Sequence, residues 1–485
     1  MEKKNGHYDR LVFVVLLLIV FSSKFKVLTT PYYWDEMGWI GAPHWLAERP
    51  LYESLPGLHP PGTFYGHPPG LHVSMALLFK MFGESIWISH FFILCFSFLG
   101  VYFTYLLAKD RFGLFTGMFA ALFLFFTPLY FTQSAMYLGD IPVAAVGVMS
   151  IYFGLNKKYL PYLIASTYLV FIKETGTALI LAFVCFLVCS EFKKDRRFYL
   201  QVLQYSIPLL TVTIFFIWQK SVTGKFVGIY SFEFDIYKHT AAQMYYDFLV
   251  ILKWIFVYQH RSILTALILL FLVFRTRRAL RKEWILILLI FILAVLPFTY
   301  FMLLPRYLIP FLPYWCIAAA WALSELISSV KIRTPIALAV TIIFIFSLSG
   351  SPSYGNQEFN MNYVKVVRMY KSMSSYIARE FPERSILTMF PYDAALLRPN
   401  LGYVTKPMKV VDFKKDIHEN ACDLILISAP EGRRFEPLMK FVEEDQMVLV
   451  KTLREEGVLT ELYKKRSVEQ QVRFDEKPGT DEGTR

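Results

Sequence analysis

Cysteine and charge are both scarce in this chain of 485 residues. Only five cysteines are present, four of them lie in apolar runs, and none forms a metal-like pair with a nearby histidine. The sequence therefore predicts no disulfide framework and no structural zinc. Charged residues make up 18% of the chain and hydrophobic residues 55%. This composition excludes an ordinary soluble protein and indicates a polytopic membrane protein.

The formal charge of +12 does not indicate a nucleic-acid-binding protein. Lys and Arg gather in short segments between apolar runs, which is the pattern that sets membrane orientation. The apolar runs predict about eleven transmembrane helices. Their approximate ranges are 11–30, 84–108, 113–132, 141–155, 159–172, 175–190, 198–219, 248–274, 284–304, 307–330 and 335–350.

The distribution of Lys and Arg predicts a cytoplasmic N-terminus. With that orientation the cytoplasmic segments hold 18 Lys and Arg, whereas the outer segments up to residue 306, which are longer in total, hold 7. An odd number of spans then makes the C-terminal domain extracytoplasmic. Residues 31–83 form a long first outer loop rich in Trp, Tyr, Pro and His, a composition typical of interfacial helices.

The composition changes after residue 350. A helix is predicted over 362–380, and strands are predicted over 385–390, 409–413, 423–428, 447–451 and 458–463. The predicted fold is thus an all-α polytopic membrane domain (1–350) followed by a small extracytoplasmic α/β domain (351–466). The polar tail 467–485 is predicted to be disordered.

Acidic residues next to two apolar runs are candidates for catalysis. Asp35 and Glu36 follow the first span, where a partly desolvated carboxylate could accept the proton of an attacking hydroxyl. The alternative is a solvated loop acid or a helix N-cap. Asp140 precedes Pro142 at the start of another span, where it could orient an acceptor or simply cap the helix.

Two basic residues at the edges of apolar runs are candidates for binding a phosphate. Lys173 and Arg306 could stabilise a lipid-phosphate leaving group. The alternatives are an internal ion pair of Lys173 with Glu174 or Asp140, and an arginine that snorkels to the interface. All these residues are predicted on the outer face. The spans beside Asp140 and Lys173 have only about 15 and 14 residues, about 21–23 Å, so either their ends are recessed in a polar cavity or the helices extend by a further turn.

Two copies of His-Pro-Pro-Gly begin at His59 and His67. Rigid proline turns hold such side chains apart, so turn structure or a substrate contact is favoured over a metal pair. No metal and no obligatory cofactor are predicted, although a divalent cation is compatible with the sequence.

The order and spacing of four motifs resemble the C-type integral-membrane glycosyltransferases. The motifs are Trp-Asp-Glu after the first span, Asp-Ile-Pro at Asp140, Lys-Glu-Thr-Gly at Lys173 and Arg-Tyr-Leu-Ile-Pro at Arg306. The similarity covers about residues 8–330. The superfamily includes protein mannosyltransferases that use dolichyl-phosphate-mannose and bacterial enzymes that transfer aminoarabinose to lipid A.

The resemblance implies an inverting glycosyltransferase that uses a polyprenyl-phosphate sugar and acts on the outer face of a membrane. It assigns catalysis to Asp35, Glu36 and Asp140 and donor-phosphate binding to Lys173, Arg306 and His67. Glu174 and Tyr307 are expected to line the site. His67 stands where relatives often carry lysine, and Glu174 replaces a residue that is often glycine.

The expected partners are the polyprenyl-phosphate sugar donor, a lipid, glycan or protein acceptor, and membrane lipids. The expected location is a bacterial inner membrane. A transporter or lipid flippase is the main alternative, but it predicts inverted repeats, and the sequence has no internal repeat. A receptor or scaffold, for which the acids of the first loop would be dispensable, is the third alternative.

Overall fold

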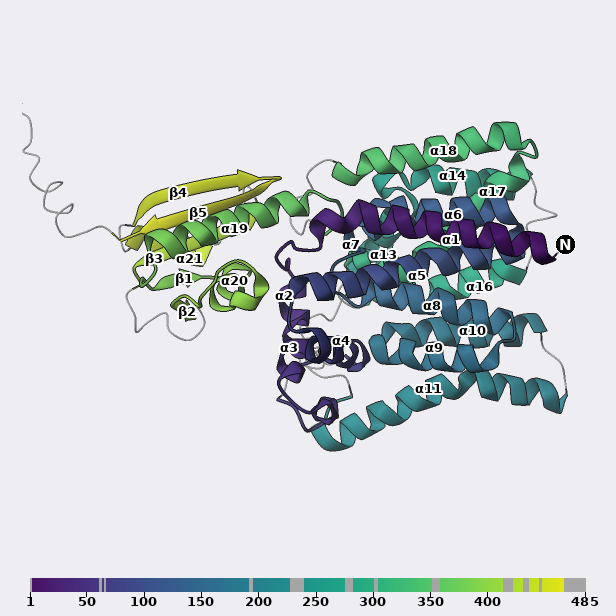
Figure 1. Cartoon of the computed structure of the whole chain (residues 1–485), viewed down its shortest axis with the longest axis horizontal. Helices are drawn as coiled ribbons and strands as arrows, with labels where there is room; N and C mark the ends of the chain where they lie inside the picture. The colour runs from purple at the N-terminus through teal and green to yellow at the C-terminus, as the bar shows by residue number, and fades with distance from the viewer. Residues whose placement is uncertain are drawn as a thin grey trace, which may run out of the picture. The chain divides into compact units, whose positions relative to one another are not determined.

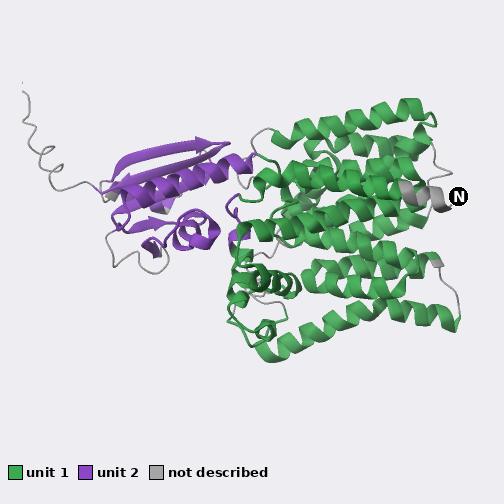
Figure 2. Cartoon of the chain, in the orientation of Figure 1, with its two compact units in different colours: residues 1–29, 38–350, 358–361 green, residues 30–37, 351–357, 362–485 purple. Residues whose placement is uncertain are grey.

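The computed structural model describes residues 2–60, 63–64, 67–191, 195–226, 240–274, 282–300, 304–350, 358–412, 422–430, 436–444 and 447–465 (Figure 1). The chain forms two compact units (Figure 2). Unit 1 comprises residues 1–29, 38–350 and 358–361, and unit 2 comprises residues 30–37, 351–357 and 362–485. This division differs from the predicted boundary at residue 350 in two short segments. Residues 30–37, which carry the first acidic motif, pack with the C-terminal domain, and residues 358–361 pack with the helices.

Unit 1 is a bundle of helices, most of which run side by side (Figure 1). Its longer described helices are α1 (Glu2–Lys24), α5 (Ile86–Phe112), α6 (Leu114–Phe126), α7 (Pro128–Gln133), α8 (Asp140–Leu155), α9 (Tyr159–Ile172), α10 (Thr175–Glu191), α11 (Arg196–Thr223), α13 (Ala241–Phe256), α14 (Ser262–Phe274), α16 (Lys282–Ile290), α17 (Leu312–Leu326) and α18 (Val330–Phe346). A π turn, η4 (Phe291–Val295), and a 3-10 turn, η5 (Leu296–Thr299), extend α16, and η6 (Pro305–Phe311) leads into α17.

Within the described residues, five helical stretches are long and apolar enough to cross a membrane. They are Ile86–Phe112, Arg196–Thr223, Lys282–Thr299, Pro305–Leu326 and Val330–Ser349. Six apolar helices are shorter, among them α8 and α9. The chain is therefore a largely helical membrane protein, as predicted.

The predicted short helices beside the polar residues are short in the structure as well. α9 has 14 residues and ends at Ile172, and Lys173 is extended with φ −161° and ψ 145°. α8 has 16 residues and starts at Asp140 itself. The alternative in which both helices extend by a further turn is wrong.

Two predicted spans are interrupted, and the first of them, 113–132, is divided at Thr127 between α6 and α7. The range 248–274, predicted as a single helix, is divided between α13 and α14 by η3 (Tyr258–His260). Gln259 and His260 have φ values of 54° and 61°, in the left-handed region that a helix cannot contain. The prediction of one continuous span was wrong because it passed over the polar stretch Gln259-His260-Arg261-Ser262 in the middle of the range.

The range predicted as the first outer loop, residues 31–83, contains helices in its described part. It contains α2 (Glu36–Trp39), α3 (Gly41–Ala47), η2 (Leu51–Ser54) and α4 (Gly70–Phe82). α3 and α4 pack through a small apolar cluster of Ala42, Leu46, Phe64 and Ala76. Gly70 permits a close approach to α9, because a Cβ atom at this position would lie 2.6 Å from the Phe171 carbonyl oxygen.

Unit 2 is a five-stranded sheet with helices on both faces. The order is β2 (Val410–Asp412), β1 (Ile386–Thr388), β3 (Leu424–Pro430), β5 (Val458–Lys464) and β4 (Val448–Glu455). β1 pairs with β2 and β3 in parallel, and β5 pairs with β3 and β4 antiparallel. The predicted helix and all five predicted strands are confirmed. The predicted disordered tail lies outside the described residues.

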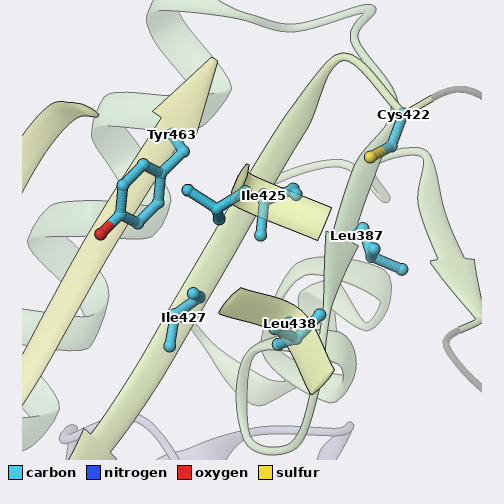
Figure 3. Packing of buried hydrophobic residues seen from close by; sticks show 7 residues of the cluster. Leu387, Cys422, Ile425, Ile427, Leu438 and Tyr463 are labelled. Atoms are coloured by element: carbon cyan, nitrogen blue, oxygen red, sulfur yellow. The ribbon is translucent and has the colours of Figure 1, made fainter. Parts of the chain in front are cut away.

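The two faces of β3 contact different helices because side chains alternate along a strand. Ile425 and Ile427 pack with Leu438 of α21 (Glu436–Glu444) in a core cluster that includes Leu387, Cys422 and Tyr463 (Figure 3). On the other face, the Ser428 hydroxyl donates to the Tyr370 hydroxyl of α19 (Tyr363–Glu380) at 3.2 Å. The Tyr370 ring also packs against Tyr392 of α20 (Tyr392–Leu397).

Candidate active site

A buried ion pair joins the two short helices of unit 1. Asp140 is the first residue of α8 and Lys173 directly follows α9. Lys173 Nζ donates to Asp140 Oδ1 at 2.8 Å, and their side chains are 4% and 2% exposed. The N-cap of α8 is Gly139 rather than Asp140. From the sequence, Lys173 could either contact a phosphate or form an internal ion pair. In this structure it is paired with Asp140.

Arg306 joins this pair from the start of η6. Its Nε lies 3.4 Å from Asp140 Oδ2, and its Nη1 donates to Glu358 Oε2 at 2.6 Å. The side chain is only 5% exposed, so the alternative in which Arg306 snorkels to the interface is wrong. Asp140, Lys173, Arg306 and Glu358 are called the ion cluster below.

Glu358 is the member of the ion cluster that sequence reasoning missed. It is 2% exposed and lies in the short segment 358–361 that packs with unit 1. The backbone carbonyl of Glu358 also accepts a hydrogen bond from Gln133 Nε2 at 3.2 Å. No sequence motif marks this residue, because it lies about 50 residues beyond Arg306 at the boundary of the C-terminal domain.

The ion cluster contains two cations and two carboxylates and is formally neutral. In a low-dielectric environment each charge is tolerated because an opposite charge lies within ion-pair distance. An additional anion would therefore have to take the place of one of the two carboxylates. Asp140 Oδ2 accepts no hydrogen bond in the described structure, so it retains capacity for a donor such as a sugar hydroxyl.

Aromatic rings surround Lys173. Its Nζ lies 4.4 Å from the ring centre of Tyr307 and 5.7 Å from that of Trp39. Tyr307 is thus beside the ion cluster, as the sequence predicted for a lining residue. Gly139 makes this packing feasible, since a Cβ atom there would lie 2.8 Å from the Trp39 ring and 3.4 Å from Lys173 Cδ.

A second polar pair, His67 and Glu174, lies beside the Trp39 ring. His67 Nδ1 lies 2.7 Å from Glu174 Oε2, and the centres of the His67 and Trp39 rings lie 4.8 Å apart, with the rings tilted by 34°. Burial opposes ionisation of Glu174, but His67 and then Lys173 outweigh it and lower the pKa of Glu174 to about 2. His67 and Glu174 are thus connected with the ion cluster through Lys173 and Trp39.

The acidic motif of the first loop belongs to unit 2. Glu36 is 1% exposed, and its Oε2 accepts a hydrogen bond from the Tyr33 backbone N–H at 2.9 Å. Burial, with Glu36 as a second cause, raises the pKa of Tyr363. Glu36 thus has a clear structural contact. Asp35 is partly exposed and follows Trp34, whose φ of 50° is in the left-handed region.

Residues of the C-terminal domain hold this acidic segment. The Tyr403 hydroxyl donates to the Tyr32 carbonyl oxygen at 2.8 Å, and the Tyr32 N–H donates to the Leu401 carbonyl oxygen at 3.2 Å. The Trp34 ring makes an edge contact with Phe390 at 5.1 Å. These contacts position the residues that directly precede Asp35.

The first histidine of the repeated motif makes only a local contact. His59 Nδ1 lies 3.2 Å from the carbonyl oxygen of Pro60, whereas His67 contacts Glu174. Among the described residues, no group of three or more His, Cys, Asp and Glu side chains is placed to hold a metal ion.

Residues 66–218 match the family described as dolichyl-phosphate-mannose-protein mannosyltransferase. The matched range contains His67, Asp140, Lys173 and Glu174. None of the curated proteins matches the sequence.

Two solved structures are similar along almost the whole chain. ArnT from Cupriavidus metallidurans in the apo state matches with a TM-score of 0.58 and 14% identity, covering 95% of this chain and 98% of ArnT.

ArnT from the same organism bound to undecaprenyl phosphate matches with a TM-score of 0.56 and 14% identity, covering 94% of this chain and 98% of ArnT. The resemblance to the mannosyltransferase and ArnT superfamily is confirmed. The fold of the chain is that of ArnT, including both the helical unit and the smaller α/β unit. The transporter alternative gains no support from these similarities.

Proposed function

We propose that this protein is an inverting glycosyltransferase that moves a sugar from a polyprenyl-phosphate donor to an acceptor hydroxyl on the outer face of the membrane. The observation that carries the proposal is the ion cluster at the ends of two short helices, within a fold shared with ArnT. The family match over 66–218 and the undecaprenyl phosphate bound by ArnT support the choice of donor.

The donor phosphate binds at Arg306 in this proposal. Because the ion cluster is neutral, the incoming phosphate replaces Glu358 at the Arg306 guanidinium. Glu358 is the carboxylate that gives way, since Asp140 is fixed in the first turn of α8 and is also bonded to Lys173. Arg306 offers planar bidentate hydrogen bonds to phosphate, and Lys173 supplies a second positive charge.

Asp35 is the proposed general base. It accepts the acceptor's proton as the acceptor oxygen attacks the anomeric carbon from the face opposite the phosphate, and the sugar–phosphate bond breaks. The lipid phosphate leaves as a stabilised anion, so the reaction needs neither a nucleotide nor an obligatory metal. Glu36 supports the loop through Tyr33 rather than taking the proton.

Asp140 is proposed to orient the sugar or the acceptor through its Oδ2 oxygen, while His67, Glu174 and Tyr307 line the site. The acceptor is a lipid, a glycan or a protein. A bacterial inner membrane, with the C-terminal domain extracytoplasmic, is the proposed location.

Mass spectrometry of envelope lipids and glycoproteins from cells with and without the protein tests the proposal. Wild-type protein is expected to add a glycan mass, and Asp35→Asn is expected to fold and to lose this product by a factor of about 10²–10⁴, the typical contribution of a general base. An Asp35→Asn variant that restores the full product would exclude Asp35 as the base. The absence of any protein-dependent sugar product would contradict the transferase itself.

A further inference from the structure

Unit 1 contains two buried cations outside the ion cluster. Lys24, the last residue of α1, is 0% exposed, and Arg261, directly before α14, is 1% exposed. In contrast to Lys173 and Arg306, neither forms an ion pair with a carboxylate in the described part of the chain. Arg261 is thus a positive charge removed from water without a matching negative charge, and Lys24 is an amine buried in the same way.

The contacts of Arg261 are weak for a guanidinium. Nη1 lies 3.5 Å from Gln259 Oε1, at the limit of a hydrogen bond, and the buried Nε has no hydrogen-bond partner among the described residues. Arginine does not lose its proton in proteins, so a buried guanidinium cannot avoid this cost by becoming neutral. Ionisable side chains within membrane segments normally face a cavity, a partner or a substrate path.

The contacts of Lys24 are also nonionic. Its Nζ lies 3.4 Å from the Met361 sulfur and 3.9 Å from the ring centre of Phe131. A sulfur atom and an aromatic face stabilise an ammonium group only weakly compared with a carboxylate or phosphate.

The 358–361 segment connects both cations with the ion cluster. Met361 contacts Lys24, and the Phe359 carbonyl oxygen accepts a hydrogen bond from Gln259 Nε2 at 2.7 Å, so Gln259 bridges this segment to Arg261. Glu358 of the same segment binds Arg306. These two buried basic side chains therefore lie beside a segment whose one carboxylate, Glu358, already binds Arg306.

We propose that Arg261 binds the phosphate of an anionic lipid, with Lys24 as a second positive charge, at a site separate from Arg306. A lipid phosphate fits because the guanidinium is buried among apolar helices, where the anion that the surrounding bilayer offers is a lipid phosphate, and because arginine forms paired hydrogen bonds with phosphate. Two sources share this chemistry, namely a polyprenyl phosphate and an anionic phospholipid of the bilayer. The inference extends the proposed function and does not depend on sugar transfer.

Native mass spectrometry of the full-length protein in detergent tests this site. The probes are undecaprenyl phosphate and phosphatidylglycerol, with zwitterionic phosphatidylcholine and inorganic phosphate as reference ligands. Wild-type protein is expected to retain an anionic probe in preference to phosphatidylcholine. Arg261→Gln is expected to weaken that retention at least tenfold, and Lys24→Met is expected to weaken it less.

Arg333→Gln is the matched control, because Arg333 lies near the start of α18 and bonds the Ser324 carbonyl oxygen. Loss of phosphatidylglycerol alone identifies a bilayer lipid, whereas loss of undecaprenyl phosphate alone identifies the polyprenyl lipid. Arg306→Gln separates the two sites: its retention of phosphatidylglycerol at Arg261 is expected to equal that of the wild type, whereas the proposed donor site loses undecaprenyl phosphate.

Equal binding of both probes by wild type and Arg261→Gln would overturn the proposal. Should Arg261→Gln fail to fold, Arg261→Lys is the alternative variant. It keeps the positive charge but lacks the planar guanidinium, so it is expected to bind the anionic probe with intermediate affinity. Wild-type binding of the anionic probes no stronger than that of phosphatidylcholine would equally overturn it.

Discussion

Arg306 lies between two buried carboxylates: its Nε is 3.4 Å from Asp140 Oδ2 and its Nη1 is 2.6 Å from Glu358 Oε2. The sequence identified Asp140 as a candidate site residue, whereas Glu358 was not predicted. Their combined charge neutralises Arg306 and Lys173, so the structure represents a state in which Glu358 occupies the position proposed for the donor phosphate.

Glu358→Gln should strengthen the binding of undecaprenyl phosphate about tenfold. The amide keeps the shape of the side chain but removes the negative charge that competes for Arg306, and a charge-assisted hydrogen bond contributes about 1.5–3 kcal/mol. Titration of the purified protein with undecaprenyl phosphate measures the effect. Glu84→Gln, which changes a carboxylate at an exposed histidine pair in the same unit, is the control. Weaker binding by Glu358→Gln would contradict the competition between Glu358 and phosphate.

Asp140→Asn should destabilise the protein by about 3–5 kcal/mol, because it leaves Lys173 buried without its main counter-ion. Asp9→Asn makes the same change at the partly exposed Asp9–Lys109 pair, where a cost of about 0–1 kcal/mol is expected. Thermal unfolding in detergent compares the two. The double variant Asp140→Asn with Lys173→Met should recover part of the loss, and simple additivity of the two losses would contradict a direct pair.

Gly139→Ala should reduce sugar transfer roughly tenfold or more without preventing folding. The added Cβ atom would meet the Trp39 ring at 2.8 Å and Lys173 Cδ at 3.4 Å, and displacement of a site residue by about 1 Å can cost about 10²-fold in rate. Gly147→Ala, in the same helix, meets Leu179 instead and tests packing away from the ion cluster. Equal activity per folded molecule in the two variants would show that Trp39 and Lys173 need not be held in place.

Glu174→Gln should lower stability at pH 5.5, and the difference from wild type should disappear as the pH falls below about 4.5. The pKa of Glu174 is lowered to about 2 by His67 and Lys173 against the effect of burial. Its ionised form therefore stabilises the folded state fully above the pKa of the unfolded chain, and that contribution is lost as the pH falls toward the folded value. Unfolding temperatures at several pH values provide the measurement, and a difference that persists undiminished at acid pH would contradict the ion pair.

Tyr403→Phe should reduce transfer roughly tenfold while leaving the binding of undecaprenyl phosphate unchanged. The variant removes the hydrogen bond to the Tyr32 carbonyl oxygen, worth about 0.5–1.5 kcal/mol, three residues before the proposed base. Tyr463→Phe removes a hydroxyl that donates to Glu461 in the same domain and should have little effect on transfer. If both variants transfer at the wild-type rate, the C-terminal domain does not position Asp35.

The sequence predicted the helical unit and the sheet of unit 2 well, because apolar length and strand alternation are local properties. It also selected Asp140, Lys173 and Arg306, which the structure brings together. Glu358 and Gln259 could not be predicted in this way. Glu358 reaches Arg306 only through the path of the chain after α18. The polar stretch Gln259-His260-Arg261-Ser262 marks a break in the apolar run but does not reveal its left-handed backbone.

The sequence pattern also did not reveal that the segment around Asp35 packs with unit 2. Residues 30–37 follow a span directly, so the chain order assigned them to the membrane domain. Their partners, Leu401 and Tyr403, are more than 360 residues away, and hydrogen bonds to backbone atoms at such separations are not encoded in a local motif. The role of Asp35 as general base is a proposal that the Asp35→Asn variant tests.

The most direct test of the account is the affinity of the full-length protein for undecaprenyl phosphate in the wild type, Lys173→Met and Arg306→Gln. The account predicts that each substitution weakens binding at least about tenfold, the equivalent of about 1.4 kcal/mol, while Arg333→Gln binds like the wild type. Wild-type affinity in both cluster variants would contradict the central claim that the ion cluster holds the donor phosphate.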